Sequence, residues 1–302
     1  MERGKRVWLW AKAHKFKAFL AAMGIFFFIE LLTIPWFSVA NLAQENPAAT
    51  ALMRQRMREA EANNTTLKIS QRWIPLSRIP RHAVNAVIVA EDGMFWEHGG
   101  FDWYEFQQSL QKNWEKKRAV RGASTITQQL AKNLYLSTSK DPIRKLKEWV
   151  ITALLEHYLV KSRILEIYLN VIEWGPGVFG IDAAARKYFG RSASGLSYDQ
   201  ALRLAAVIPS PLKHRPTDQS RWMNYRRNIV AQRMLGRHYD VDEEEFEEEE
   251  EEQSQEKETT SSQPSIEQSP ADSGDESLTM PTDSTDIGKG DSNDVQRRKP
   301  AD

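Results

Sequence analysis

The sequence contains no cysteine among its 302 residues, and this absence removes several kinds of site at once. Disulfide frameworks, thiolate nucleophiles and zinc–thiolate centres all require cysteine. The compartment is left open, because a chain without cysteine is compatible with oxidising and reducing surroundings alike. Long stretches of alternating apolar and polar residues are also lacking, which argues against long β-strands.

Net charge is absent too, since 41 lysines and arginines balance 41 aspartates and glutamates. The charges are nevertheless segregated. Residues 241–302 carry 21 acidic and 5 basic side chains, so the first 240 residues carry 36 basic and 20 acidic ones, a net charge of +16. A basic body predicts an anionic partner: nucleic acid, a phosphate-bearing substrate or an anionic membrane surface. The acidic segment has too little apolar surface to offset the entropy of ordering, so we predict a disordered tail over 241–302.

Charge is almost missing from Ala18 to Gln44, where Glu30 is the single formally charged residue. About twenty apolar residues suffice to cross a bilayer, and the six lysines and arginines that precede this stretch favour a cytoplasmic N-terminus. We therefore predict a basic cytoplasmic segment over 1–17 and a transmembrane anchor over 18–40. An ionised carboxylate at mid-span costs about 3 kcal/mol, so a protonated or helix-paired Glu30 is expected.

A cleaved signal peptide is the alternative reading of the same stretch. Ala18–Ile29 also suits the apolar core of a signal, and the small residues Ser38 and Ala40 suit a cleavage site. The apolar character continues as far as Phe37, beyond the length that a signal needs, and this favours the anchor.

The remaining residues predict an all-α protein. Residues 41–72 are polar and helix-prone and are interpreted as a membrane-proximal connector, and 73–240 as a globular helical domain. Capping boxes are predicted at Asp102 with Glu105, Thr125 with Gln128 and Ser197 with Gln200, and Asp141 before Pro142 is a further helix start. Together with apolar periodicity, these signals predict helices over 82–92, 103–117, 125–136, 142–159, 163–171, 178–188, 198–208 and 219–237.

Chemistry is concentrated in four clusters. The first, "EDGMFWEHGGFD", mixes Glu91 and other titratable groups with aromatics and glycines, as the wall of a cleft does. The second is "RGASTITQQLAKNLYL", in which Thr125, Gln129 and Lys132 share one helix face. The third, beginning "RKLKEWV" at Arg144, and the fourth, "GPGVFGIDAAARKYFG", complete the set. Basic side chains and amides that converge near a helix N-terminus suit a phosphate, although each cluster taken alone is equally explained by surface ion pairs.

Taken together, the clusters resemble the peptidoglycan glycosyltransferases. The order and spacing of "EDxxFxxHxGFD", "GASTITQQLAKN", "RKxxE" and "GxxAAxxYFG" are similar to the monofunctional, membrane-anchored biosynthetic transglycosylases over about residues 80 to 236. This resemblance implies an all-helical, lysozyme-like fold. It also implies that the substrate is lipid II, a disaccharide-pentapeptide carried by undecaprenyl pyrophosphate, which is polymerised into β-1,4-linked glycan strands.

The resemblance also implies residue roles. Glu91 would be the general base that removes the proton from the acceptor 4-hydroxyl as it attacks C1 of the donor sugar, with inversion at that carbon. Lys132, Arg144 and Lys145 would stabilise the pyrophosphate, and Glu148 would be a second essential carboxylate that orients the cations or a divalent ion. An apolar wall beside Glu91 would raise the pKa of its carboxyl group. Positions that match the cleft are Asp92, Phe95, His98, Thr125, Gln129 and Asn133.

For partners and surroundings, the resemblance implies lipid II, the growing glycan strand, membrane lipid and other cell-wall synthases, with no nucleic acid. The expected location is the bacterial inner (cytoplasmic) membrane, crossed once, with the catalytic domain on the periplasmic side. No cofactor is expected to be required and no metal site is assigned to named residues, and the resemblance leaves open a divalent cation, Mg²⁺ or Mn²⁺, near the pyrophosphate. His98 is interpreted as a hydrogen-bonding residue, because no cysteine or second histidine lies nearby.

Two rival functions stay open at this point. A lytic glycan-cleaving enzyme also uses one glutamate in a lysozyme-like fold, and a catalytically silent, membrane-tethered scaffold of the cell-wall machinery needs no chemistry at all. Two features depart from the family pattern: Gln200 stands where a glutamate is common, and the acidic tail has no counterpart.

Overall fold

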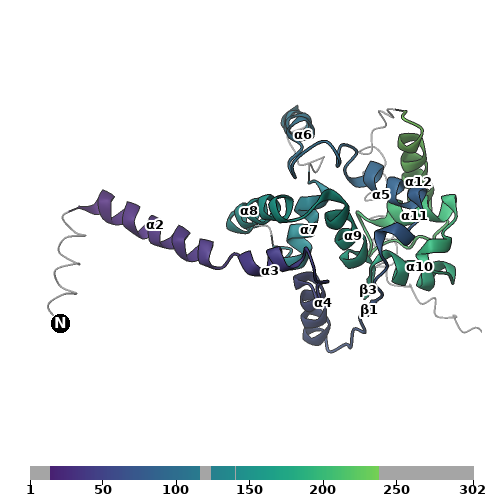
Figure 1. Ribbon diagram of the computed structural model, residues 1–302, viewed down its shortest axis with the longest axis horizontal. Coiled ribbons are helices and arrows are strands. Elements are labelled where there is room, and N and C mark those ends of the chain that lie inside the picture. The colour runs from purple at the N-terminus through teal and green to yellow at the C-terminus, as the bar shows by residue number, and fades with distance from the viewer. Residues whose placement is uncertain (1–13, 116–123, 140, 238–302) are drawn as a thin grey trace, which may run out of the picture. The chain divides into compact units, whose positions relative to one another are not determined.

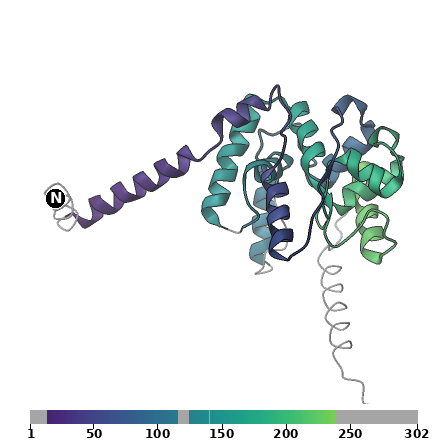
Figure 2. The ribbon, with the colours of Figure 1, turned by 90° about the horizontal axis from the view of Figure 1, so that it is seen from below.

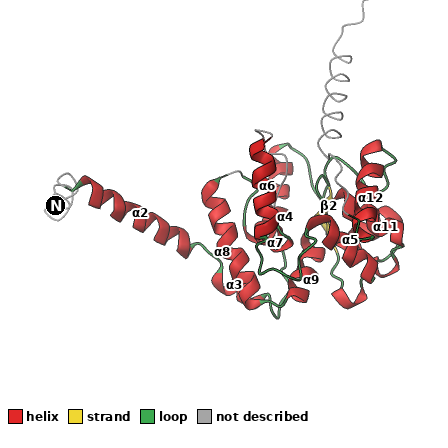
Figure 3. Cartoon of the chain, turned by 90° about the horizontal axis from the view of Figure 1, so that it is seen from above, coloured by secondary structure: helices red, strands yellow, loops and turns green. Residues whose placement is uncertain are grey.

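The computed structural model describes residues 14–115, 124–139 and 141–237. Helices dominate this part of the chain, which confirms the all-α prediction (Figure 3). The α-helices are α2 (Lys15–Leu32), α3 (Trp36–Asn41), α4 (Ala51–Ala62), α5 (Arg81–Glu91), α6 (Trp103–Glu115), α7 (Ile126–Tyr135), α8 (Pro142–Tyr158), α9 (Lys161–Val171), α10 (Ile181–Phe189), α11 (Tyr198–Val207) and α12 (Arg221–Met234). Two 3-10 helices, η1 (Leu76–Arg78) and η2 (Ala193–Gly195), accompany them. The predicted acidic tail and the start of the "RGAST" cluster lie outside the described residues.

Several helices begin where capping chemistry predicts. Complete capping boxes form at Thr125 with Gln128 and at Ser197 with Gln200, in which each hydroxyl accepts from a backbone N–H and each amide side chain accepts from the cap. Asp102 accepts a 2.8 Å hydrogen bond from the backbone of Glu105 at the start of α6. These bonds satisfy N–H groups that would otherwise lack partners, so the first turn of each helix is fixed.

One predicted helix, over 178–188, begins later than expected. Residues Val178–Phe179 form strand β3, which lies between β1 (Ser70–Gln71) and β2 (Glu173–Gly175). β1 runs parallel to β3, with Ser70 opposite Val178, and β2 runs antiparallel to it. Strands this short show no alternating pattern. Gly180 then starts α10 at φ +83°, where a Cβ atom would lie 2.7 Å from the carbonyl oxygen of Asn170.

The apolar N-terminal segment forms two helices. α2, drawn in purple in Figure 2, ends at Leu32, and α3 begins after Pro35, which cannot continue a helix. Within the described residues, Lys15–Asn41 is the one helical segment long and apolar enough to cross a membrane. Only 6% of its most apolar window is buried, so it is not a core helix of the domain. A signal sequence near the N-terminus would have the same length and composition.

The hydrophobic core brings two groups of helices together. α5 packs against α11 and α12, and α7 packs against α4, α8 and α9, as Figure 1 shows. α3 also packs on α8, and the segment expected as a connector, 41–72, includes α4, whose Leu52 and Met53 are buried against Phe179. This arrangement brings the C-terminal end of α5, with Glu91, into electrostatic reach of α7.

Candidate active site

Glu91 is the last residue of α5 and is half-buried. Its Oε2 accepts a 2.8 Å hydrogen bond from Nε2 of Gln129, and Oε1 of Gln129 accepts a 2.9 Å bond from the hydroxyl group of Tyr168. The tyrosine thereby fixes which end of the amide faces the carboxylate. Burial raises the pKa of Glu91, against the opposing effects of the Gln129 hydrogen bond and of nearby cations, the direction expected from the sequence. A carboxyl group with a raised pKa is suited to act as a general base near neutral pH.

Lys132 lies on α7, three residues after Gln129 and on the same face. Burial lowers the pKa of its ammonium group, as do the charges of Arg144 and Lys145, whereas Glu148 and Glu91 act in the opposite direction. Among the described residues, no hydrogen-bond acceptor or ion-pair partner contacts its ammonium group. Lys132 is therefore available to bind an anionic ligand.

Glu148 is a carboxylate that holds two cations. It is almost completely buried on α8, and it forms ion pairs with Arg144 at 2.6 Å and with Lys145 at 2.5 Å, one carboxylate oxygen to each. Both partners lie on the same helix, three and four residues earlier. The Nε of Arg144 is buried and has no hydrogen-bond partner among the described residues. Glu148 therefore orients both cations.

Asp92 and His98 build the turn that docks the start of α7. One oxygen of Asp92 bonds Nε2 of His98 at 2.8 Å and the other accepts from the backbone of Ile126 at 2.9 Å. Because Nδ1 of His98 accepts from the backbone of Gly100, the proton of a neutral ring lies on Nε2. Thr125 donates to the carbonyl of Gly100 at 2.8 Å. Asp92, His98 and Thr125 therefore fix the start of α7, and these polar groups are engaged with each other and with the backbone.

Asp92, His98 and Asp102 also place one potential metal-ligand atom each within 4.8 Å of one another. The hydrogen bonds above already use both oxygens of Asp92 and both ring nitrogens of His98. Asp102 caps α6. A cation at this point would have to break the bond between Asp92 and His98, so the residues are better explained as a hydrogen-bonded cluster.

The two remaining residues expected at the cleft lie in or near the core. Phe95 is fully buried, with its ring packed edge-on against Trp96 at 5.0 Å between centroids and with the ammonium of Lys161 4.5 Å from its centre. Asn133 is buried on α7 next to Lys132. Trp96, in contrast, is 53% exposed. Of this aromatic pair, Trp96 is the one that meets solvent.

Two arginines and a tyrosine were not predicted as site residues. Arg226 and Arg233 of α12 act electrostatically on Glu91 and lower the pKa of its carboxyl group, and Arg233 also donates to the carbonyl of Ala90 at 3.3 Å. They are seven residues apart and so share one helix face. That spacing is visible in the sequence, but nothing in it connects this face to α5. Tyr168 orients Gln129, but in the sequence it is an aromatic residue on the apolar face of a helix, which does not indicate a role in the site.

Gln200, the departure from the family pattern, has a structural explanation. Its side-chain oxygen accepts a 3.0 Å hydrogen bond from the backbone of Ser197, as the third-position side chain of a capping box does. A glutamine performs this task as a glutamate does.

Comparison with known proteins places the same region in one family. The family model described as Transglycosylase matches residues 58–235, which contain all the residues discussed in this section. A biosynthetic peptidoglycan transglycosylase of Nitrosospira multiformis is 48% identical over 189 residues, covering 63% of this chain and 82% of that protein. A protein of the same name from Methylobacillus flagellatus is 47% identical over 191 residues, covering 63% and 83%. Another, from Dechloromonas aromatica, is 41% identical over 215 residues, covering 71% and 92%.

Proposed function

Since the chain belongs to the transglycosylase family, we propose that it polymerises lipid II into β-1,4-linked glycan strands and releases undecaprenyl pyrophosphate. One observation carries the proposal. The carboxyl group of Glu91, whose pKa is raised, interacts electrostatically with Lys132. Lys132 in turn interacts with Arg144 and Lys145, which Glu148 holds by ion pairs. A base and a set of fixed positive charges are what transfer from a sugar diphosphate requires.

The reaction follows from these groups. Glu91 accepts the proton of the acceptor 4-hydroxyl while the hydroxyl oxygen attacks C1 of the donor sugar. The bond from C1 to the pyrophosphate oxygen breaks, and its electron pair leaves with the pyrophosphate. Lys132 and Arg144 stabilise the negative charge that develops there, because their orientation is set before the reaction by burial and by Glu148. Attack from the side opposite the leaving group inverts the configuration at C1.

We further propose that no cofactor is required, because Lys132, Arg144 and Lys145 already supply positive charge at the expected pyrophosphate position. A divalent cation such as Mg²⁺ or Mn²⁺ would add to that charge and would not replace it. Polymerisation in the presence of excess chelator tests this point. Retention of most of the activity supports the proposal, and complete loss that added Mg²⁺ restores contradicts it.

We propose that the chain crosses the bacterial inner membrane once and that its catalytic domain lies on the periplasmic side, beside the growing strand and other cell-wall synthases. The apolar α2 with its exposed side chains supports an anchor. Large exposed side chains on α6, Trp103 (64%), Tyr104 (69%) and Trp114 (84%), support contact of the domain with the lipid surface, where amphipathic aromatics are favoured.

The deciding experiment is polymerisation of labelled lipid II by the purified full chain in detergent, with products separated on a gel. Wild type should give a ladder of glycan chains, Glu91→Gln none, and Glu97→Gln, which alters an exposed carboxylate six residues away, the wild-type ladder. A lytic enzyme would instead shorten preformed glycan, and a scaffold would give no product from wild type. Ladder formation by Glu91→Gln near the wild-type rate would remove Glu91 from the role of base.

A further inference from the structure

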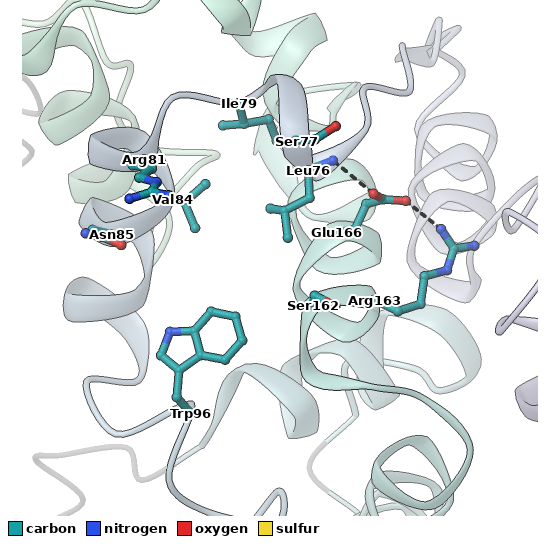
Figure 4. A pocket seen from close by; sticks show the side chains of 10 residues that line it. All are labelled: Leu76, Ser77, Ile79, Arg81, Val84, Asn85, Trp96, Ser162, Arg163 and Glu166. Atoms are coloured by element: carbon teal, nitrogen blue, oxygen red, sulfur yellow. Dashed lines mark hydrogen bonds and ion pairs between the residues drawn. The ribbon is translucent and has the colours of Figure 1, made fainter.

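A hollow of about 720 Å³ lies between α5 and α9, apart from the residues of the candidate active site (Figure 4). Arg81, Val84 and Asn85 of α5 form one wall, Leu76 of η1 and Ser162 of α9 form the other, and Trp96 lies at one end. Neither Glu91 nor any of the cations assigned to the pyrophosphate lines this hollow. Its volume is in the range of sites that bind small organic ligands.

The lining of the hollow includes hydrogen-bond donors that have no partner in the described part of the chain. Arg81 and Asn85 are exposed, and no hydrogen-bond or ion-pair partner contacts either side chain among the described residues. Trp96, 53% exposed, adds an indole N–H and a flat apolar face. A ligand that places a carboxylate at Arg81 and apolar atoms against Trp96 would match this lining.

The one carboxylate in the hollow is already engaged. Oε2 of Glu166 accepts from the backbone of Leu76 at 2.9 Å, and Oε1 accepts from Arg163 at 2.6 Å (Figure 4). Arg163 is in turn held by the carbonyl oxygens of Leu42 and Glu45. Glu166 therefore does not neutralise Arg81, and the guanidinium group is left to a ligand.

The position of the hollow along α5 connects it with the reaction. Val84 and Glu91 are seven residues apart on this helix and share a face. Arg81 and Glu91 lie at its two ends, about 15 Å apart at 1.5 Å per residue. A fully extended five-residue peptide spans at most about 17 Å. A pentapeptide attached to a sugar beside Glu91 is thus long enough to bring its terminal carboxylate to Arg81.

We propose that this hollow binds the peptide stem of the substrate, with the C-terminal carboxylate at Arg81 and the chain running along α5 toward Glu91. The inference rests on the proposed function, because that function supplies the peptide-bearing sugar. It adds a specificity site, remote from the reacting atoms, that distinguishes a complete stem from a shortened one.

Kinetics with two lipid-linked substrates, one with the pentapeptide and one without any peptide, test the inference. The quantity compared is kcat/KM with the pentapeptide substrate divided by kcat/KM with the peptide-free one. This ratio should fall about five- to tenfold in Arg81→Gln, the loss typical of one charge-assisted contact at a solvent-exposed site. Arg78→Gln is the matched control, since Arg78 is exposed on the adjacent η1 and does not line the hollow. An unchanged ratio in Arg81→Gln, or an equal fall in both variants, overturns the proposal.

Binding without turnover separates this inference from the proposed function. By calorimetry, the full chain in detergent should bind a soluble disaccharide-pentapeptide more tightly than the same compound with a C-terminal amide, and Arg81→Gln should remove the difference. Equal affinities for acid and amide, or no binding at millimolar concentration, overturn the inference even if polymerisation is normal. If the chain binds the acid more tightly than the amide but does not polymerise lipid II, the result supports the peptide-binding site and contradicts the proposed reaction.

Discussion

At the residue scale, the raised pKa of Glu91 is also a statement about stability. A carboxyl group whose pKa is higher in the folded than in the unfolded chain binds its proton more tightly when folded. Stability is therefore lost as the pH rises from the unfolded pKa through the folded one.

Glu91→Gln should consequently raise the Tm at pH 7 by about 2 °C or more while it abolishes polymerisation. The amide oxygen of the new side chain can still accept the hydrogen bond from Gln129, and the burial of a charge is removed. Thermal unfolding followed by circular dichroism measures this, and the variant Glu97→Gln should show no such rise. A Tm below that of wild type would mean that Glu91 is held ionised by favourable contacts.

Gln129 supplies the hydrogen bond that keeps the pKa of Glu91 from rising further. In Gln129→Met the pKa should be higher, so the acidic limb of the pH dependence of kcat/KM should move to higher pH, because the base must lose its proton to work. Tyr168→Phe, which only frees the orientation of the amide, should give a smaller shift in the same direction. Acidic limbs that coincide with wild type in both variants would show that Glu91 does not set this limb.

Lys132 should set the alkaline limb of the pH dependence of kcat/KM. Burial lowers the pKa of its ammonium group, which must carry its charge to stabilise the leaving pyrophosphate, so activity should fall as the pH rises through that lowered pKa. Arginine does not lose its proton in this range. Lys132→Arg should therefore shift the alkaline limb to higher pH, whatever its effect on the maximum rate, and an unshifted limb would assign it to another group.

At the scale of elements, the single carboxylate of the apolar helix α2 has a partner outside that helix. Glu30 forms an ion pair with Lys147 of α8, the helix that also carries Arg144 and Glu148. The sequence predicted a protonated or helix-paired carboxyl, and the structure gives it an ammonium partner from the catalytic domain. The next helix, α3, is also bonded to the domain, because the hydroxyl groups of Ser38 on α3 and Tyr135 on α7 lie 3.0 Å apart.

Lys147→Met should leave Glu30 without its counter-charge and destabilise the chain by about 1 kcal/mol or more, since about three-quarters of each side chain is covered. The doubly exchanged variant, Glu30→Lys with Lys147→Glu, should recover most of the loss. Thermal unfolding in detergent, together with polymerisation rates, compares the three proteins. Equal stability of wild type and Lys147→Met would show that the pair contributes nothing.

Helices were predictable from the sequence where local chemistry sets their ends. Thr125, Asp141 and Ser197 each cap a helix within one or two residues of the predicted start, because a cap acts on its own first turn. The prediction over 178–188 was early because β3 depends on pairing with β1 and β2, which are distant in the sequence. Gly180, with its positive φ, marks the change from strand to helix.

At the scale of the whole molecule, the sequence indicated which candidate site residues share a helix face, but it did not indicate which other helices pack around them. Arg144 and Lys145 precede Glu148 by four and three residues, so the sequence predicted that they share one face of a helix. The contributions of Arg226, Arg233 and Tyr168 to the surroundings of Glu91 depend on how α12, α9 and α5 pack, and no spacing within a helix encodes that. The hollow at Arg81 is of the same kind, because it needs α9, which follows α5 by about eighty residues in the chain, to pack opposite Arg81.

The proposed reaction requires that a base and a set of fixed cations bind a sugar diphosphate between them. An experimental structure of the full chain with a non-reacting lipid II analogue tests it most directly. We predict phosphate oxygens within hydrogen-bond distance of Lys132 and Arg144, and the acceptor hydroxyl within hydrogen-bond distance of Glu91. A diphosphate bound away from these cations, or a reacting hydroxyl that faces another residue, would contradict the account.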